Sequence, residues 1–167
     1  MQVPIRKKPG KYSNLETDPH ITEARFIELK DELQKLKKNA HPRAASEVKR
    51  QAEFGDFSDN AAYSMAKGRL RWINQRISDL EKQLKNSIII KPIKNAKKVE
   101  LGNKVIIKIE GKEKTYLILG SSETDPAKNI ISHSSPIGSA LLDHKIGDRV
   151  KINLADKEIE CEIIGIW

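Results

Sequence analysis

Residues 26–48 read FIELKDELQKLKKNAHPRAASEV, and residues 66–84 read AKGRLRWINQRISDLEKQL. In both stretches apolar side chains recur at intervals of three and four residues, which places them on one face of a helix. Thr22, just ahead of the first stretch, is a suitable N-cap. Pro42 is expected to kink the first helix or split it locally, because proline lacks a backbone N–H. The two stretches predict two long amphipathic helices.

The two apolar series match each other when one of them is read backwards. The residue numbers of each matched pair sum to 113 or 114. Such a near-constant sum is expected when two antiparallel helices fold about one turn and bury their seams together. Half of the sum places the turn near residue 57, and the resulting hairpin is roughly 40 Å long at the helical rise per residue. The matched pairs are Leu29 and Leu84, Leu33 and Leu80, Leu36 and Ile77, Ala40 and Ile73, Ala44 and Leu70, and Val48 and Ala66.

The turn of this hairpin, residues 53–63, reads EFGDFSDNAAY and contains three acidic side chains and no basic one. One interpretation is structural, with Gly55 ending the first helix. Asp56, Ser58 or Asp59 would then cap the second helix, whose N-terminus favours acidic groups. The other interpretation is functional, because two carboxylates three residues apart at a helix start can converge on one Mg²⁺ ion.

Asp56 and Asp59 alone would hold Mg²⁺ weakly. This ion keeps several waters and is commonly bound by one or two carboxylates together with phosphate oxygens. The pair would bind it usefully where another protein supplies further carboxylates and RNA supplies a phosphate. The functional interpretation is therefore an accessory finger that completes a two-metal phosphodiesterase site.

The positive charge of the chain is concentrated in its N-terminal part. The net charge is +8, and residues 1–98 contain 22 Lys and Arg against 12 Asp and Glu, whereas residues 99–167 contain 9 against 11. This asymmetry fits either a polyanionic partner such as nucleic acid or a solvated, lysine-rich helix face. The sequence has no apolar run of membrane-spanning length and no signal-peptide pattern at its N-terminus. Its one cysteine excludes a disulfide framework, so a cytoplasmic protein is expected.

The C-terminal part has the pattern of a small sheet with one helix. Alternating apolar residues predict two β-hairpins, one over residues 105–119 with a turn at Gly111-Lys112 and one over residues 150–163. Between them, Ser135-Pro136 suits the N-cap and first position of a short helix that runs through Leu142. The predicted fold is therefore α+β, with an N-terminal antiparallel helical hairpin and a small antiparallel sheet with one helix.

This pattern divides the chain into four segments, on the basis of composition and of the polar, lysine-rich stretch that follows the second helix. They are a basic, mobile tail over residues 1–20, the coiled-coil hairpin with its acidic tip over residues 21–90, a linker over residues 91–98 and the C-terminal domain over residues 99–167.

Two motifs resemble the GreA/GreB family of transcript-cleavage factors. Residues 55–63 resemble the tip signature of that family, in which Asp56 matches the first acid and Asp59 matches the second, where the family usually has Glu. Residues 131–142, followed by Gly147-Asp148, resemble a segment of the family's C-terminal domain. The resemblance covers roughly residues 20 to 167 in the expected order.

The resemblance implies a bacterial transcription elongation factor, and a monomer is expected because the sequence shows no obvious dimer surface. Its FKBP-like C-terminal domain would dock on a coiled coil of the largest subunit of RNA polymerase, at the mouth of the secondary channel. Asp56 and Asp59 would hold the second Mg²⁺, shared with the polymerase, for cleavage of backtracked nascent RNA. The chain would thus activate the polymerase and not be an enzyme itself.

The resemblance also assigns two further groups of residues. Those expected near the RNA 3′ end are Lys49, Arg50, Lys67, Arg69 and Arg71, and those expected to dock on the polymerase are Ser135, Pro136 and Ile137.

Two other functions stay open. One is an inhibitor with the same fold whose tip occludes the polymerase channel. The Asp at position 59, where the family usually has Glu, leaves this alternative open. The other is a coiled-coil RNA-binding or chaperone-like module whose tip acids are only helix caps.

Other reactive side chains carry weaker signals. The four histidines, at positions 20, 41, 133 and 144, show no metal-ligand spacing. Cys161 lies on a strand pattern and is expected in the core, and Trp72 and Trp167 are expected to be packing residues.

Overall fold

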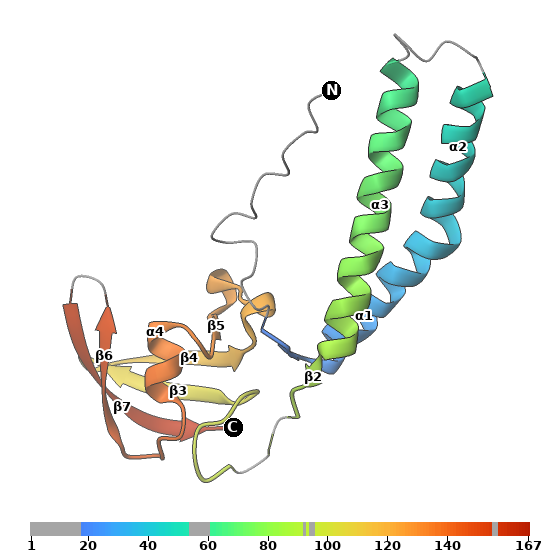
Figure 1. The fold of residues 1–167 in the computed structure, drawn as a ribbon. Coiled ribbons are helices and arrows are strands. Elements are labelled where there is room, and N and C mark those ends of the chain that lie inside the picture. Colours follow the sequence, from blue (N-terminus) through green and yellow to red (C-terminus); the bar gives the residue numbers. More distant parts are fainter. Residues whose placement is uncertain (1–17, 54–60, 92, 94–95, 155–156) are drawn as a thin grey trace, which may run out of the picture.

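The computed structural model describes residues 18–53, 61–91, 93, 96–154 and 157–167. Figure 1 shows a long helical hairpin formed by the N-terminal half and a curled sheet with one short α-helix formed by the C-terminal half. This arrangement confirms the predicted α+β fold.

The hairpin has two arms. The first arm comprises helix α1 (Glu23–Lys35), a π-helical turn η1 (Leu36–Ala40) and helix α2 (His41–Glu53), and the second arm is helix α3 (Ala61–Asn86). Thr22 caps α1 as predicted, since its side-chain oxygen accepts a hydrogen bond from the backbone N–H of Arg25 at 3.2 Å. None of the described helices is long and apolar enough to cross a membrane.

The first arm departs from α-helical geometry just before Pro42. The backbone N–H of His41 bonds to the carbonyl of Leu36, five residues back, which is the π-helical pattern. Because Pro42 has no N–H to donate, the α-helical ladder cannot pass through it unchanged. The predicted local split is therefore confirmed, and it takes the form of one π-helical turn.

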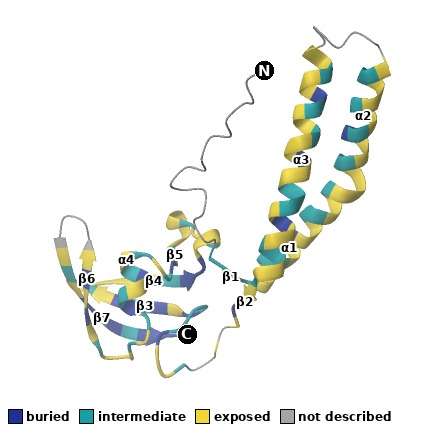
Figure 2. Ribbon diagram, in the orientation of Figure 1, coloured by how far each residue is buried: buried dark blue, intermediate teal, exposed yellow. Residues whose placement is uncertain are grey.

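The predicted seam between the two arms is formed. At the base, Leu29 and Leu80 are fully buried, and toward the tip the seam is closed by the buried side chains of Ala44, Ala66 and Ile73. Figure 2 shows buried and half-buried segments on the facing sides of the two arms. Leucine at the base gives a broad apolar contact, whereas alanine near the tip lets the helices approach closely. Partly buried residues that pack at the base are Phe26, Leu33, Leu36 and Leu84.

Ion pairs cross the hairpin beside this seam. Arg76 donates from Nε and Nη2 to the two carboxylate oxygens of Glu32, at 2.8 and 3.0 Å. Lys37 pairs with Glu81 across the same part of the hairpin. Such two-pronged arginine–carboxylate contacts favour one alignment of the arms, although each exposed pair adds little to stability.

Two short strands close the base of the hairpin. Strand β1 (His20–Ile21) pairs in parallel with strand β2 (Ile88–Ile89). Ile21 is fully buried and packs with Leu29 and Leu80. The segment before the first arm and the segment after the second arm are thus held together before the chain continues to the C-terminal half.

The C-terminal half forms a five-stranded sheet in the order β5-β4-β3-β7-β6. Neighbouring strands are antiparallel, as predicted, except that the edge strand β5, which was not predicted, pairs in parallel with β4. The strands are β3 (Lys104–Ile109), β4 (Lys112–Leu119), β5 (Ile130–Ser132), β6 (Arg149–Leu154) and β7 (Lys157–Ile166). The described helices of this half are the 3₁₀ turns η2 (Ser121–Glu123) and η3 (Pro126–Lys128) and the α-helix α4 (Pro136–Leu141).

Both predicted β-hairpins are present. Ile109 pairs with Lys112, so the first turn is Glu110-Gly111, one residue earlier than predicted. Both turn residues have positive φ, 49° and 80°, the conformation of the two-residue turns that fit strand twist. In the second hairpin Leu154 pairs with Lys157, and the residues between them lie outside the described part of the chain.

The core of this half lies between the sheet and α4. Leu141 of α4 is fully buried against Val105, Ile107 and Ile163 of the sheet. Cys161 belongs to the same cluster and is 2% exposed, and burial raises the pKa of its thiol. These observations confirm that Cys161 is a core residue.

The prediction that both tryptophans pack inside is wrong. Trp72 is 63% exposed and Trp167 is 72% exposed. On α3 the buried seam position belongs to the neighbouring Ile73, and Trp72 lies at the surface, where it lines a hollow together with Glu32 of the first arm. Trp167 follows the last strand, and its backbone bonds to Lys104 while its ring stays at the surface.

Candidate functional site

The predicted acidic tip belongs to the connection between the two arms. Helix α2 ends at Glu53 and α3 begins at Ala61, so this connection falls where the matched apolar series placed it (Figure 1). Asp56 and Asp59 lie outside the described residues, as does the alternative in which they cap α3. The structure describes the two antiparallel helices that flank this connection, and these helices pack against each other through small side chains.

Three of the residues expected near RNA lie on the tip half of α3. Lys67 and Arg71 are one turn apart and share a face, whereas Arg69 points about 200° away from both. Arg69 faces the first arm, where its Nη1 lies 3.8 Å from Glu47 Oε2. The Lys67 ammonium lies 4.2 Å from the centre of the Tyr63 ring, a cation–π contact. The fold thus groups Lys67 with Arg71 and separates Arg69 from them.

The other two residues of this group, Lys49 and Arg50, lie on α2 and are both exposed. As consecutive residues they point about 100° apart. Arg50 is in the last turn of α2, where a positive charge stabilises the negative end of the helix dipole. Part of the positive charge near the tip therefore has a structural use as well.

The predicted docking segment begins helix α4. Ser135 caps the helix, since its Oγ accepts a hydrogen bond from the Gly138 N–H at 3.0 Å and donates one to the Ser132 carbonyl at 2.7 Å. Pro136 occupies the first helical position and is exposed, whereas Ile137 packs against the core. A Cβ on Gly138 would lie 2.1 Å from the Ser132 carbonyl oxygen, so the helix start is packed tightly against β5.

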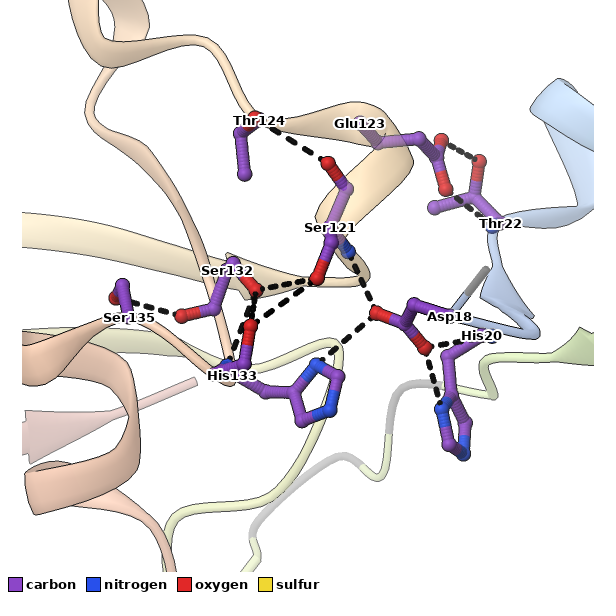
Figure 3. A network of polar contacts seen from close by, with 10 residues as sticks. Asp18, His20, Thr22, Ser121, Glu123, Thr124, Ser132, His133 and Ser135 are labelled. Carbon is purple, nitrogen blue, oxygen red and sulfur yellow. Dashed lines mark hydrogen bonds and ion pairs between the residues drawn. The ribbon is translucent and has the colours of Figure 1, made fainter. Parts of the chain in front are cut away.

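A polar network joins the two halves of the chain near the base of the hairpin (Figure 3). Asp18 Oδ1 accepts a hydrogen bond from the His20 N–H at 3.0 Å and lies 2.9 Å from His20 Nδ1. Asp18 Oδ2 accepts one from the Ser121 N–H at 2.6 Å and lies 3.3 Å from His133 Nδ1. Burial alone would raise the pKa of Asp18, but the hydrogen bonds from Ser121 and His20 outweigh it and lower the pKa from 3.8 to about 2.

Three serine hydroxyl groups extend this network inside the C-terminal half. Ser121 Oγ lies 2.8 Å from Ser132 Oγ and 3.1 Å from Ser134 Oγ, and the last two lie 2.7 Å apart. This cluster holds η2 against the end of β5, directly beside His133. The histidine and the Ser121 N–H are therefore presented to Asp18 by one connected unit.

A hollow of about 1040 Å³ opens beside the network. Its walls include His20, Ser121 and His133 on one side and Asp79 and Lys82 of α3 on the other. The network is therefore open to small ligands.

The fold brings together two of the four histidines, although their positions in the sequence show no metal-ligand spacing. The rings of His20 and His133 lie 5.5 Å apart at an interplanar angle of 72°. One donor atom from each lies within 4.8 Å of a carboxylate oxygen of Asp18. Spacing rules detect ligands on one helix or loop, whereas this cluster joins segments far apart in the chain. The only local signal is the Asp-x-His sequence at residues 18–20, which lies in the segment that the composition assigns to the tail.

Sequence comparisons place this two-part fold in a known class, the transcription elongation factors. A family model described as "Transcription elongation factor, N-terminal" matches residues 20–89, and one described as "Transcription elongation factor, GreA/GreB, C-term" matches residues 94–167. The chain belongs to the GreA/GreB family.

Similar curated proteins share the name "Transcription elongation factor GreA". The protein of Oenococcus oeni is 35% identical over 150 residues, which cover 87% of this chain and 93% of that protein. The proteins of Staphylococcus saprophyticus and Clostridium acetobutylicum are each 36% identical, over 149 and 150 residues, covering 87% of this chain and 94% of those proteins.

Solved structures of related factors also match. GreA factor homolog 1 (Gfh1) of Thermus thermophilus aligns with a TM-score of 0.40 and 23% identity, over 88% of this chain and 97% of that one. The elongation factor GreA/GreB of Nitrosomonas europaea aligns with a TM-score of 0.39 and 20% identity, over 87% and 96%. The family assignment rests on the sequence matches.

Proposed function

We propose that this chain binds RNA polymerase at the secondary channel and stimulates cleavage of backtracked nascent RNA. The C-terminal domain docks on the coiled coil of the largest subunit, and the hairpin extends down the channel. Asp56 and Asp59 then complete the polymerase active site. Membership of the GreA/GreB family is the observation that carries this proposal.

The dimensions of the hairpin suit a probe that works at a distance from its docking domain. Helix α3 has 26 residues, which corresponds to about 39 Å at 1.5 Å per residue. The alanine-lined seam keeps the far half of the hairpin slender. A narrow and stiff support of this kind can carry two carboxylates into a channel.

The chemistry assigned to Asp56 and Asp59 requires a partner. Two carboxylates hold Mg²⁺ weakly by themselves, so the polymerase carboxylates and an RNA phosphate supply the remaining ligands. When bound there, Mg²⁺ stabilises the charge that develops during phosphodiester cleavage. The chain therefore acts as an activator of a reaction that belongs to the polymerase, and it functions as a monomer.

The positive side chains along the hairpin are assigned to binding of the RNA 3′ end, and their contributions to this binding differ. Lys67 and Arg71 share one face of α3 and present a paired positive charge to a phosphate backbone. Arg69 contributes less, because Glu47 faces it across the seam. Lys49 and Arg50 on α2 add to the positive field around the tip.

The docking contact is assigned to the start of α4. Pro136 is exposed there, and Ser135 and Ile137 hold it in place by capping the helix and packing against the core. Replacing Pro136 by a charged residue would disturb a partner's surface more than this domain itself. That substitution separates loss of docking from loss of folding.

The test is transcript cleavage in a backtracked elongation complex supplied with Mg²⁺. Wild-type chain is expected to stimulate cleavage, and Asp56→Asn and Asp59→Asn are expected to bind the polymerase but lose stimulation by about a hundredfold or more. The matched control is Glu53→Gln, which removes an exposed acid at the end of α2 and leaves the pair intact.

Other outcomes would contradict the proposal. Binding without cleavage by the wild-type chain would identify a channel-occluding inhibitor. The side chain of Asp59, which is shorter than the Glu usual in the family, would then explain the lack of cleavage. RNA or client binding without any polymerase binding would identify an RNA-binding or chaperone-like module.

A further inference from the structure

Three side chains of metal-binding type meet where the hairpin joins the C-terminal half (Figure 3). Asp18 and His20 precede α1, and His133 follows β5, and one donor atom of each lies within 4.8 Å of the other two. Two of the separations are short: 2.9 Å between Asp18 Oδ1 and His20 Nδ1, and 3.3 Å between Asp18 Oδ2 and His133 Nδ1.

These separations suit a small divalent ion. Ligand atoms 2.0–2.1 Å from a tetrahedral zinc ion stand about 3.3 Å apart. The two short carboxylate–imidazole distances, 2.9 and 3.3 Å, run to different oxygens of Asp18 and lie near this value. The two imidazoles need to approach each other by at most about 1.5 Å, and their side chains are 31% and 25% exposed, so both have room to rotate.

One observation favours a bound ligand over a cluster that is held by hydrogen bonds alone. His133 Nδ1 is buried and has no hydrogen-bond partner of suitable geometry among the described residues, although Asp18 Oδ2 is near. A buried polar atom in this state costs free energy, and coordination to a metal would satisfy it.

We propose that Asp18, His20 and His133 bind one divalent transition-metal ion, and that Zn²⁺ is the ion their chemistry fits. Two imidazole nitrogens and one carboxylate oxygen favour Zn²⁺ and its neighbours over Mg²⁺ and Ca²⁺, which prefer oxygen ligands. All three side chains line the hollow beside the network, so a water molecule can complete the coordination. The site is independent of the Mg²⁺ proposed at the hairpin tip.

Such an ion would bridge the two halves of the chain. Two ligands belong to the segment that leads into the first arm, and the third belongs to the C-terminal half. Binding would therefore stabilise one orientation of the hairpin relative to the sheet and would raise the unfolding temperature as the ion concentration increases.

The experiment uses the full chain without a histidine tag, stripped of metal by a chelator and titrated with ZnCl₂ by calorimetry near neutral pH. One ion per chain is expected, and excess MgCl₂ should not displace it. His20→Gln and His133→Gln should each weaken binding by about tenfold or more. The matched control, His144→Gln, removes a histidine that faces Asp148 at 3.4 Å outside the cluster and should leave the affinity unchanged.

A second measurement needs no variant. In NMR spectra of the wild-type chain, Zn²⁺ should shift the imidazole signals of His20 and His133 and leave those of His41 and His144 in place. The proposal is overturned if the wild-type chain shows no saturable binding, if the control loses as much affinity as the cluster variants, or if all four histidines shift alike. None of these outcomes depends on transcript cleavage, so failure here is distinct from failure of the proposed function.

Discussion

Glu123 of η2 makes two hydrogen bonds to Thr22, the N-cap of α1. Its Oε2 accepts from the Thr22 N–H at 2.7 Å and its Oε1 accepts from the Thr22 hydroxyl at 2.6 Å. The Thr22 oxygen in turn accepts from the Arg25 N–H. In a capping box, a glutamate of the same helix accepts a hydrogen bond from the backbone N–H of the N-cap residue. Here a carboxylate from the C-terminal half accepts that hydrogen bond instead. The start of the hairpin and the position of η2 are therefore coupled.

Glu123→Gln is expected to lower the free energy of unfolding by about 1–2 kcal/mol. The amide loses the charge that favours the helix N-terminus, and it places a donor opposite a donor on Thr22. Urea unfolding measures the change, and hydrogen exchange should show lost protection in the first turn of α1. Glu113→Gln, at an exposed position of β4, is the control and should change stability by less than about 0.5 kcal/mol. Equal effects of the two substitutions would contradict the coupling.

Gly120→Ala is expected to open the contact between the two halves of the chain. A Cβ at Gly120 would lie 1.9 Å from the backbone carbonyl oxygen of His20, so the two backbones must separate. Forcing atoms into a packed site costs about 1–3 kcal/mol. The measurement is the urea midpoint together with the NMR signals of Asp18 and His20. Unchanged signals at these two residues would show that the close approach is absent in solution.

Gly68→Ala is the matched substitution at a site without this constraint. Gly68 is exposed in the interior of α3, and nothing lies within 4 Å of the position that its Cβ would take. Alanine should therefore stabilise the chain by about 0.5–1 kcal/mol, because glycine in a helix carries a larger backbone entropy cost. Thermal unfolding followed by circular dichroism tests this. A lower unfolding temperature would mean that Gly68 is needed for a contact that the structure of the helix does not show.

Asp18→Asn isolates the pH dependence of the polar network. The pKa of Asp18 is about 2 in the folded chain and 3.8 without these contacts. Because the folded value is the lower one, the stabilisation is fully present above about pH 4 and is lost as the pH falls toward 2. With a chelator present, the unfolding temperature of the wild-type chain should exceed that of the variant near pH 5, and the difference should shrink below about pH 4. A difference that stays constant over this range would contradict the assigned pKa.

The regular parts of the fold could be predicted from the sequence because they depend on local patterns. The apolar intervals predicted the seam, in which Leu29 and Leu80 are buried, and Thr22 was recognisable as a cap from residue type and position. Strand β5 was missed because three residues, Ile130–Ser132, are too short to show alternation.

The contacts between the halves could not be predicted in the same way. Asp18, Ser121 and His133 become neighbours only after the whole chain has folded, and nothing in their spacing indicates it. The tryptophan error has a related cause, since residue type alone assigned Trp72 to the interior while the helical interval gave that place to Ile73.

Ala66→Leu is expected to separate the two arms near the tip. Ala66 is 4% exposed and Ala44 is 3% exposed, so the larger side chain must displace the facing helix, at a cost of about 1–3 kcal/mol. Hydrogen exchange should show lost protection along α2, while the leucine layer at the base stays protected.

The same variant connects the seam to the proposed function. If the close approach of the arms positions Asp56 and Asp59, Ala66→Leu should still bind the polymerase but stimulate less cleavage, since displacement by about 1 Å can cost a hundredfold in rate. Ser64→Leu, at an exposed position on the same part of α3, is the control. Full cleavage by Ala66→Leu together with lost protection in α2 would show that the carboxylates do not depend on the seam for their position. Loss of cleavage in both variants would instead point to a leucine side chain that obstructs the channel.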